Sequence, residues 1–355
     1  MFISHKLKEV QAIADKITVI RQGKVVGERP PSATDGELAA LMVGRNVQLR
    51  VSKDEASPGD VRLAVRDLIV PGDTGRSAVE GISFEVRAGE ILGVAGVQGN
   101  GQTELCEALM GLRPSSGTVI LGGHDISADT PHDRLQAGIG YIPEDRQEDG
   151  LVGEFPVADN LILDVYDQPP FARGIALDLD QIRATATARV PEFDIRTASI
   201  AARVASLSGG NQQKVILARE IGRELRVLLA SQPTRGLDVG SIEFVHRRIV
   251  EQRDRGLAVI LVSSELDEIY ALADRIAVMY EGRITGFRPP TVSVEELGLL
   301  MTGGSTDTDD GGAAAGPVAQ AGPLDAVGGT AGVENPGSPV AEAGDTGQPG
   351  QEEPS

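Results

Sequence analysis

Residues 90–96, Glu-Ile-Leu-Gly-Val-Ala-Gly, form an apolar run that ends in glycines, and a segment with helical spacing follows at 101–112. A short apolar run of this kind is typical of a strand that is buried on both faces of a sheet. Further apolar runs at 227–230 and 258–263 each follow a helical segment. Strands that alternate with helices predict an α/β fold with a parallel core sheet covered by helices.

Two other segments extend this core. Residues 62–68 and 82–87 alternate apolar and polar residues, as half-exposed antiparallel strands do, so we expect an antiparallel β-subdomain. Between about 151 and 205 the pattern is mainly helical, which predicts an inserted helical subdomain. The complete unit is expected to span 62–303.

The chain also contains an internal repeat. Residues 3–31 align without gaps with 262–290, and the match continues from 37–44 to 296–303, with about 18 of 42 positions identical. The first copy matches only the last part of the unit. Its pattern predicts strands at 2–4, 17–20 and 24–28 and helices at 6–13 and 35–43.

Residues 1–44 are therefore interpreted as the C-terminal remnant of a first unit, and the polar residues 45–61 as a linker. About 44 residues of this kind cannot form an adequate core alone, so we expect the fragment to borrow a surface or to be mobile. The chain begins one strand before His5, as a truncated gene product or a misplaced start codon would produce.

Composition excludes several classes of protein. The formal net charge of −19 argues against a nucleic-acid partner, and about nine of the acidic residues lie in 304–355, which we expect to be a disordered tail. The single Cys106 rules out an internal disulfide framework and fits a reducing cytosol. No apolar run approaches the ~20 residues that span a bilayer, and the N-terminus does not read as a signal peptide. Membrane association is therefore expected to require a partner protein.

A glycine-rich stretch, Gly-Val-Gln-Gly-Asn-Gly-Gln-Thr at 96–103, joins the first apolar strand to its helix. The spacing is that of a phosphate-binding loop, in which backbone N–H groups surround phosphate oxygens at a helix start. Thr103 occupies the position that would hold Mg²⁺, whereas Gln102 replaces the usual lysine. Taken alone, the stretch also fits an ordinary glycine-rich turn.

Two more motifs follow in order. Leu-Ser-Gly-Gly-Asn-Gln-Gln-Lys at 207–214 precedes an amphipathic helix, and Pro-Thr-Arg-Gly-Leu-Asp at 233–238 follows an apolar strand. With the glycine-rich loop, they resemble the nucleotide-binding domain of ATP-binding-cassette (ABC) transporters. The detailed sequence, including Ile-Pro-Glu-Asp-Arg-Gln-Glu-Asp-Gly-Leu-Val at 142–152, resembles importer ATPases for nucleosides and simple sugars and looks most like the second cassette of the nucleoside-importer members. The resemblance covers 1–303.

The resemblance implies a P-loop NTPase cassette that uses ATP and Mg²⁺. It implies nucleotide-binding roles for Gly96, Gly99, Asn100, Gly101, Gln102, Thr103, Glu104, Ser208, Gly209, Gly210 and Gln212. In this family two cassettes meet head to tail, and each ATP lies between the glycine-rich loop of one cassette and the Leu-Ser-Gly-Gly helix of the other.

The resemblance also implies that the site is degenerate. Ser231 and Gln232 stand where the family has an Asp that steadies Mg²⁺ and a Glu that polarises water, and an amide is a poor general base. Ser264 replaces the switch histidine that the first copy keeps as His5, and Glu144 stands where a glutamine usually reaches the metal. We therefore expect no catalytic residue among these positions and slow or absent ATP hydrolysis, whereas the Leu-Ser-Gly-Gly segment is intact.

The implied function is the ATP-binding subunit of an importer for nucleosides or simple sugars. Its partners would be permease subunits, a second cassette and, indirectly, an extracellular solute-binding protein, and it would lie peripherally on the cytoplasmic face of the membrane. The alternative is a non-catalytic remnant that binds nucleotide weakly or acts as a scaffold, and the DNA upstream of Met1 would discriminate the two. A soluble cassette protein that acts on ribosomes or DNA fits the acidic charge less well.

We expect four other residues that could carry chemistry to have structural roles only. His124, His132 and His246 lack the spacing of metal ligands and are expected on the solvated surface. Cys106 is expected to pack in the core.

Overall fold

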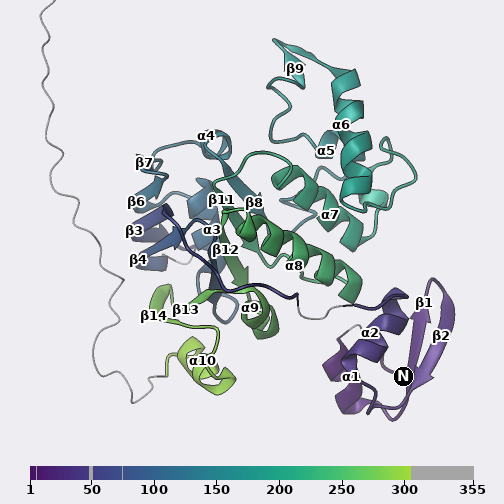
Figure 1. Cartoon of the computed structure of the whole chain (residues 1–355). Helices are drawn as coiled ribbons and strands as arrows, with labels where there is room; N and C mark the ends of the chain where they lie inside the picture. Colours follow the sequence, from purple (N-terminus) through teal and green to yellow (C-terminus); the bar gives the residue numbers. More distant parts are fainter. Residues whose placement is uncertain (5, 48–50, 74, 305–355) are drawn as a thin grey trace, which may run out of the picture. The chain divides into compact units, whose positions relative to one another are not determined.

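The computed structural model describes residues 1–304 except 5, 48–50 and 74 (Figure 1). His5 and nearly all of the segment expected to form a disordered tail, 304–355, therefore lie outside the described residues. Within the described part of the chain, the centre is a six-stranded sheet in the order β14-β13-β5-β12-β11-β8. Its strands are β5 Ile91–Ala95, β8 Ile139–Ile142, β11 Val227–Ser231, β12 Ala258–Ser263, β13 Arg275–Tyr280 and β14 Arg283–Arg288.

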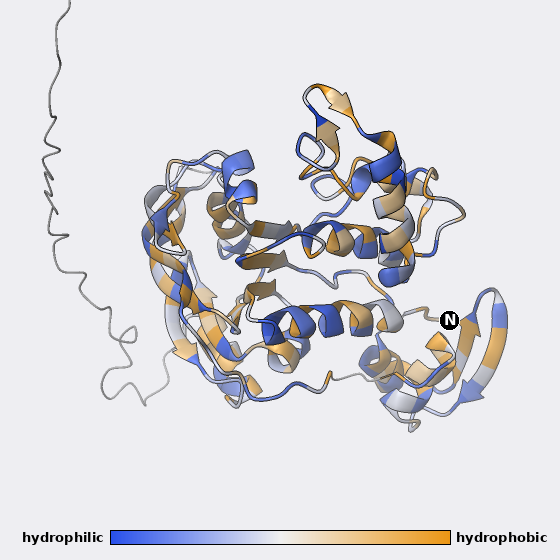
Figure 2. Cartoon of the chain, turned by 45° about the horizontal axis from the view of Figure 1, so that its top comes forward, coloured by the Kyte–Doolittle hydropathy of each residue, from blue (hydrophilic) through white to orange (hydrophobic). Residues whose placement is uncertain are grey.

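All neighbouring pairs in this sheet are parallel except β13 with β14. Successive residues of β11 point to opposite faces: Val227 and Leu229 join one core, whereas Leu228 and Ala230 join the other. A sheet covered on both faces must be apolar at every position, which explains the unbroken apolar runs in the sequence. Figure 2 shows these strands as predominantly hydrophobic. The prediction of a parallel core sheet is confirmed.

One face of the sheet packs on helix α3, Gln102–Met110, and on a four-stranded antiparallel sheet in the order β4-β3-β6-β7. Leu105 and Leu109 of α3 are fully buried in this core. The antiparallel strands are β3 Val61–Pro71, β4 Ser77–Arg87, β6 Ser116–Leu121 and β7 His124–Asp125, and α4, Pro131–Gln136, follows them. The expected antiparallel subdomain is therefore present.

The other face is covered by helices whose apolar sides point inward, including Val215, Ile249 and Ile269. These helices are α7 Gly209–Glu220, α8 Val239–Asp254, α9 Leu266–Leu272 and α10 Val294–Met301. Asp238 caps α8 by accepting the N–H groups of Gly240 and Ser241 at 3.0 and 3.1 Å. The Asp of the Pro-Thr-Arg-Gly-Leu-Asp motif therefore starts a helix.

The inserted segment at 151–205 is helical only in part. Its elements are α5 Val157–Asn160, β9 Ala172–Arg173, β10 Ala176–Leu177, α6 Leu179–Glu192 and the short 3₁₀ turn η1 Val204–Ser206. Asn160, fully buried, accepts the N–H of Val152 at 2.9 Å and donates to its carbonyl at 3.1 Å. A single buried amide thus ties α5 to the segment that enters the insert.

The repeat in the sequence is also a repeat of structure. Helices α1 Leu7–Ile13 and α2 Asp35–Val43 and strands β1 Ile17–Arg21 and β2 Lys24–Arg29 correspond to α9, α10, β13 and β14. Both hairpins have a register shift at the same place, between Val19 and Ile20 and between Val278 and Met279. Both turns place a glycine in the left-handed region, Gly23 at φ 76° and Gly282 at φ 75°.

The expected strand at 2–4 is wrong, because these residues have no regular secondary structure. Their equivalents at the end of β12 pair with β11 on one side and β5 on the other. Among described residues 1–47 no such neighbouring strand exists, so the backbone has nothing to pair with. The first copy does have a small core of its own, around Ile17, Val19 and Leu38.

The expected linker at 45–61 has contacts with the second copy where it is described. Residues 51–60 form no helix or strand, yet Lys53 donates to the carbonyls of Leu272 and Ala273 and to Asp274, each at 2.7 Å. Burial lowers the pKa of Lys53 despite its carboxylate partner. In the part of the chain that the structure describes, no helix is both long and apolar enough to cross a membrane.

Candidate nucleotide site

The predicted site residues gather at one edge of the sheet. Strands β5, β8, β11 and β12 are parallel, so their carboxyl ends lie together. Just beyond those ends come the glycine-rich loop, Glu144, Gln232 and Ser264. Ligands of open α/β sheets bind at this edge. The topology therefore brings together residues that are far apart in the sequence.

The glycine-rich loop keeps the shape of a phosphate cradle. A Cβ built on Gly101, which has φ 99°, would lie 2.2 Å from the carbonyl oxygen of Ala78, so only glycine fits. The turn between β13 and β14 holds the loop from the other side: Gly282 N–H donates to the Asn100 carbonyl at 3.0 Å, and Glu281 N–H to its Oδ1 at 3.1 Å. The loop is thus fixed before any ligand arrives.

Gln102 folds back into this loop. Its Nε2 donates to the Val97 carbonyl at 3.1 Å, and its Oε1 accepts the N–H of Asn100 at 3.1 Å. The side chain is buried and lies against Gly96, where a Cβ would meet Nε2 at 2.5 Å. Gln102 therefore uses one of the loop N–H groups that a phosphate-binding loop directs toward phosphate.

Thr103 and Glu144 contact each other. The Thr103 hydroxyl donates to Glu144 Oε2 at 3.2 Å, and Gln98 Nε2 donates to Oε1 at 3.3 Å. Arg235 Nη1 makes a short ion pair with the same Oε1. We call these four residues the Glu144 cluster. Sequence reasoning missed Arg235, because its position inside Pro-Thr-Arg-Gly-Leu-Asp gives no sign that it meets a residue some ninety positions earlier.

Ser231 and Gln232, which stand where carboxylates were expected from the family resemblance, make hydrogen bonds within the protein. Ser231 is buried at the end of β11, and its hydroxyl contacts the thiol of Cys106, whose pKa is raised to about 12 chiefly by burial. Gln232, at φ 48°, accepts at Oε1 from both the N–H and the hydroxyl of Ser264 at 3.3 Å. The interpretation of Cys106 as a core residue is confirmed.

The protein oxygens nearest the glycine-rich loop already have partners. In nucleotide sites Mg²⁺ takes near-octahedral oxygen ligands, typically one or two carboxylates together with phosphate oxygens and waters. In the described ranges no group of three or more His, Cys, Asp or Glu residues could hold a metal. The Thr103 hydroxyl is donating to Glu144, whose carboxylate is already paired with Arg235. A role of Thr103 in Mg²⁺ binding stays a prediction that these contacts do not favour.

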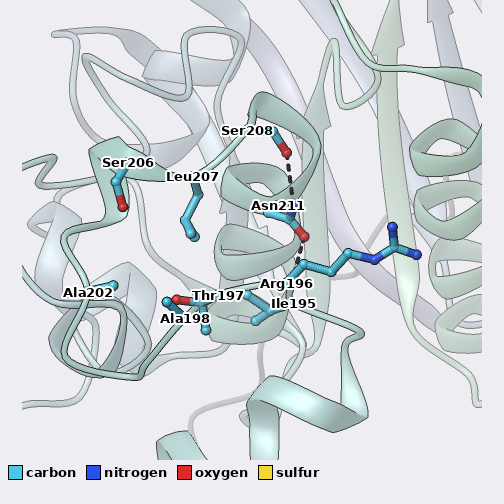
Figure 3. Close-up of a pocket in the computed structure, with 9 residues that line it drawn as sticks. All are labelled: Ile195, Arg196, Thr197, Ala198, Ala202, Ser206, Leu207, Ser208 and Asn211. Carbon is cyan, nitrogen blue, oxygen red and sulfur yellow. Dashed lines mark hydrogen bonds between the residues drawn. The ribbon is translucent and has the colours of Figure 1, made fainter. Parts of the chain in front are cut away.

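The Leu-Ser-Gly-Gly segment begins helix α7, where Ser208 is the exposed N-cap residue. Asn211 Nδ2 donates to Ser208 Oγ at 2.9 Å, and Asn211 Oδ1 accepts the N–H of Arg196 at 2.8 Å (Figure 3). A pocket of about 650 Å³ lies beside them and is lined by Ile195, Arg196, Thr197, Ala198, Ala202, Ser206, Leu207, Ser208 and Asn211. The exposed serine and its free helix start remain open to a partner.

Not every predicted residue lies where the sequence suggested. Gln212 is buried, and its Nε2 donates to the Val204 carbonyl at 3.3 Å, so it supports the turn before α7 instead of facing a ligand. Glu104 is half-buried in the first turn of α3. His124 and His132 are exposed as expected.

The expectation for His246 is wrong. It is buried on α8, and its Nε2 lies 2.9 Å from Glu268 Oε1. The same oxygen accepts the Thr234 hydroxyl at 2.7 Å. His246 and Thr234, a residue of the Pro-Thr-Arg-Gly-Leu-Asp motif, therefore share a buried carboxylate oxygen.

The fold and the arrangement of the site edge are those of a P-loop ABC ATPase cassette. Residues 79–235 match the family model described as ABC transporter. Among solved structures, the chain resembles an ATP-binding subunit of an ABC transporter, with a TM-score of 0.56 and 23% identity over 68% of this chain and 99% of that one. It also resembles the ATP-binding cassette MJ1267 in its ADP conformation, with a TM-score of 0.56 and 18% identity over 68% and 95% of the two chains. At these identities the likeness concerns the fold.

By sequence the chain is similar to import ATP-binding proteins for nucleosides and sugars. The chain is 48% identical over 86% of its length to the nucleoside import ATP-binding protein NupA of Lactococcus lactis, and covers 61% of it. The guanosine import ATP-binding protein NupO of Bacillus subtilis is 47% identical over 84% of this chain and 59% of its own length. The ribose import ATP-binding protein RbsA of Chromobacterium violaceum is 39% identical, over 87% and 61%. The chain thus spans about three fifths of these relatives.

Proposed function

We propose that this chain is the ATP-binding subunit of an importer for nucleosides or simple sugars and that its own nucleotide site does not hydrolyse ATP. The observation that carries the proposal is a contrast between the site edge and the start of α7. Gln102, Gln232 and Ser264 bond within the site edge and Ser231 contacts Cys106, whereas Ser208 stands exposed at a helix start. Gln232 holds an amide where water would need a base.

The exposed helix start would serve a second cassette. Backbone N–H groups at a helix N-terminus favour anions, and Ser208 is exposed at the N-terminus of α7. In this arrangement residues 62–303 form the second cassette, 1–44 are the end of a first cassette, and 45–61 link them. The nucleotide bound by the glycine-rich loop of a partner cassette would then meet Ser208.

The insert would dock on the permease. Its surface exposes six large apolar side chains, namely Val152, Phe155, Tyr166, Ile175, Leu177 and Leu179. Exposed apolar residues gathered on one subdomain favour contact with another protein. The subunit would lie peripherally on the cytoplasmic face of the membrane through this contact, and a solute-binding protein would act on the opposite side.

Phosphate release from ATP by the purified chain tests the hydrolysis part of this proposal. We expect turnover far below the ~1–100 s⁻¹ typical of phosphoryl-transfer enzymes such as kinases. Turnover in that range would refute it. Placing a negative charge on the apolar surface of the insert, Phe155→Asp, should reduce recovery of the subunit with its permease, whereas Arg173→Ala, an exposed change on the same insert, should not.

A further inference from the structure

Arg235 brings a positive charge to the position where the cassette has lost its metal ligands. Its guanidinium pairs with Glu144, and the same carboxylate accepts the hydroxyl of Thr103 in the first turn of α3. Cation, carboxylate and loop hydroxyl thus form one connected group. The Arg235 side chain is 59% exposed, so its remaining N–H groups can reach a ligand, whereas Glu144 is only 17% exposed.

The backbone of Arg235 is held in place. Its N–H donates to the Gln232 carbonyl at 3.1 Å, and its own carbonyl accepts Nη1 of Arg146 at 2.8 Å. The side chain therefore extends toward Glu144 from a fixed base. A planar guanidinium has five donors in a fork that suits phosphate oxygens, so pairing one nitrogen with Glu144 leaves others available.

An anionic ligand at the glycine-rich loop would meet the carboxylate of Glu144. Without a counter-charge, two anions would face each other, and a divalent cation is the usual remedy. Here Arg235 already neutralises that carboxylate, and the Thr103 hydroxyl is bonded to the same carboxylate. We propose that Arg235 takes the place of the divalent cation, so that the glycine-rich loop binds nucleoside triphosphate without a metal.

This inference rests on the proposed binding of nucleotide by the glycine-rich loop. The test is the dissociation constant of ATP for the full chain, measured by equilibrium dialysis in excess Mg²⁺ and again in EDTA. The two values should agree within about threefold, that is, within about 0.7 kcal/mol. Weakening by more than tenfold in EDTA would overturn the inference.

Variants identify the cation. In EDTA, Arg235→Ala should weaken ATP binding by at least about tenfold, because an uncompensated Glu144 then faces the phosphates. Arg173→Ala removes another exposed arginine that pairs with a carboxylate, Asp178 on the insert, and it should leave the constant unchanged. Unchanged binding in Arg235→Ala would also overturn the inference.

The double variant Arg235→Ala with Glu144→Gln distinguishes an electrostatic role of Arg235 in ATP binding from a purely structural role. It removes both charges, so ATP affinity in EDTA should recover to within about threefold of the parent chain. Failure to recover, or no measurable ATP binding by the parent chain in either buffer, would refute the metal-free site. The role of Ser208 toward a partner cassette would stand, because it is measured in the assembled transporter.

Discussion

Replacing Gln102 by lysine changes a single side chain of the glycine-rich loop. Its effects on ATP binding and on ATP hydrolysis can be measured separately. In the native chain the amide makes two hydrogen bonds inside the loop, to the Val97 carbonyl and from the Asn100 N–H. The lysine frees the Asn100 N–H for phosphate and places a full positive charge beside it. Hydrogen bonds to charged groups contribute about 1.5–3 kcal/mol each, so we expect ATP affinity to rise roughly 10- to 100-fold.

Hydrolysis should not follow. Gln232 would still hold an amide where a base is needed, and its Oε1 would still accept from Ser264. Isothermal titration gives the dissociation constant, and phosphate release at saturating ATP gives the turnover. Gln136→Lys, which adds the same charge at an exposed position on α4, is the control and should change neither quantity.

Two results would refute this reasoning. A parallel gain in binding and turnover would show that Gln232 does not limit the chemistry. No gain in ATP affinity would show that the hydrogen bonds of Gln102 leave the glycine-rich loop available to phosphate.

Three further predictions concern stability. His246→Ala should lower the free energy of unfolding by about 2–4 kcal/mol in denaturant titrations, because it removes one of the partners of the buried Glu268. His132→Ala, at an exposed position, is the control and should change it by less than about 0.5 kcal/mol. Burial, together with the nearby Asp164 carboxylate, raises the pKa of Glu220, so the native state binds a proton more tightly than the unfolded chain. The stability of wild type relative to Glu220→Gln should therefore fall as pH rises through about 6, and an increase would contradict this. Thr130→Ala removes the capping box of α4 and should cost about 1 kcal/mol; an unchanged unfolding midpoint would show that the cap is dispensable.

The sequence predicts the parts of the fold whose patterns are local. Strands β5, β11 and β12 read as apolar runs because both of their faces are buried, and the repeat fixes the hairpins at both ends of the chain. The strand expected at 2–4 fails because pairing is not local: its equivalent in β12 needs β5 and β11 on either side. The hairpin β9–β10 is missed because strands of two residues leave no period to detect.

The candidate site divides in the same way. The glycine-rich loop and the Leu-Ser-Gly-Gly segment are runs of consecutive residues, and the structure has the first between β5 and α3 and the second at the start of α7. The hydrogen-bond partners of three residues depend on neighbours that only the fold brings close, so they could not be predicted from the sequence. These residues are Gln102, Gln212 and His246. The pairing of Arg235 with Glu144 is the clearest case, because it joins two loops that follow different strands.

The most direct test of the central claim is the ATPase rate of the assembled transporter carrying one of two substitutions in this cassette. Ser208→Arg places a bulky side chain at the helix start that would face the nucleotide of the partner cassette, whereas Gln232→Ala alters only the site of this chain. We predict that Ser208→Arg lowers the rate by about 100-fold or more, since loss of a fixed donor to developing charge costs 10²–10³, and that Gln232→Ala leaves it unchanged. The opposite pattern would contradict the account.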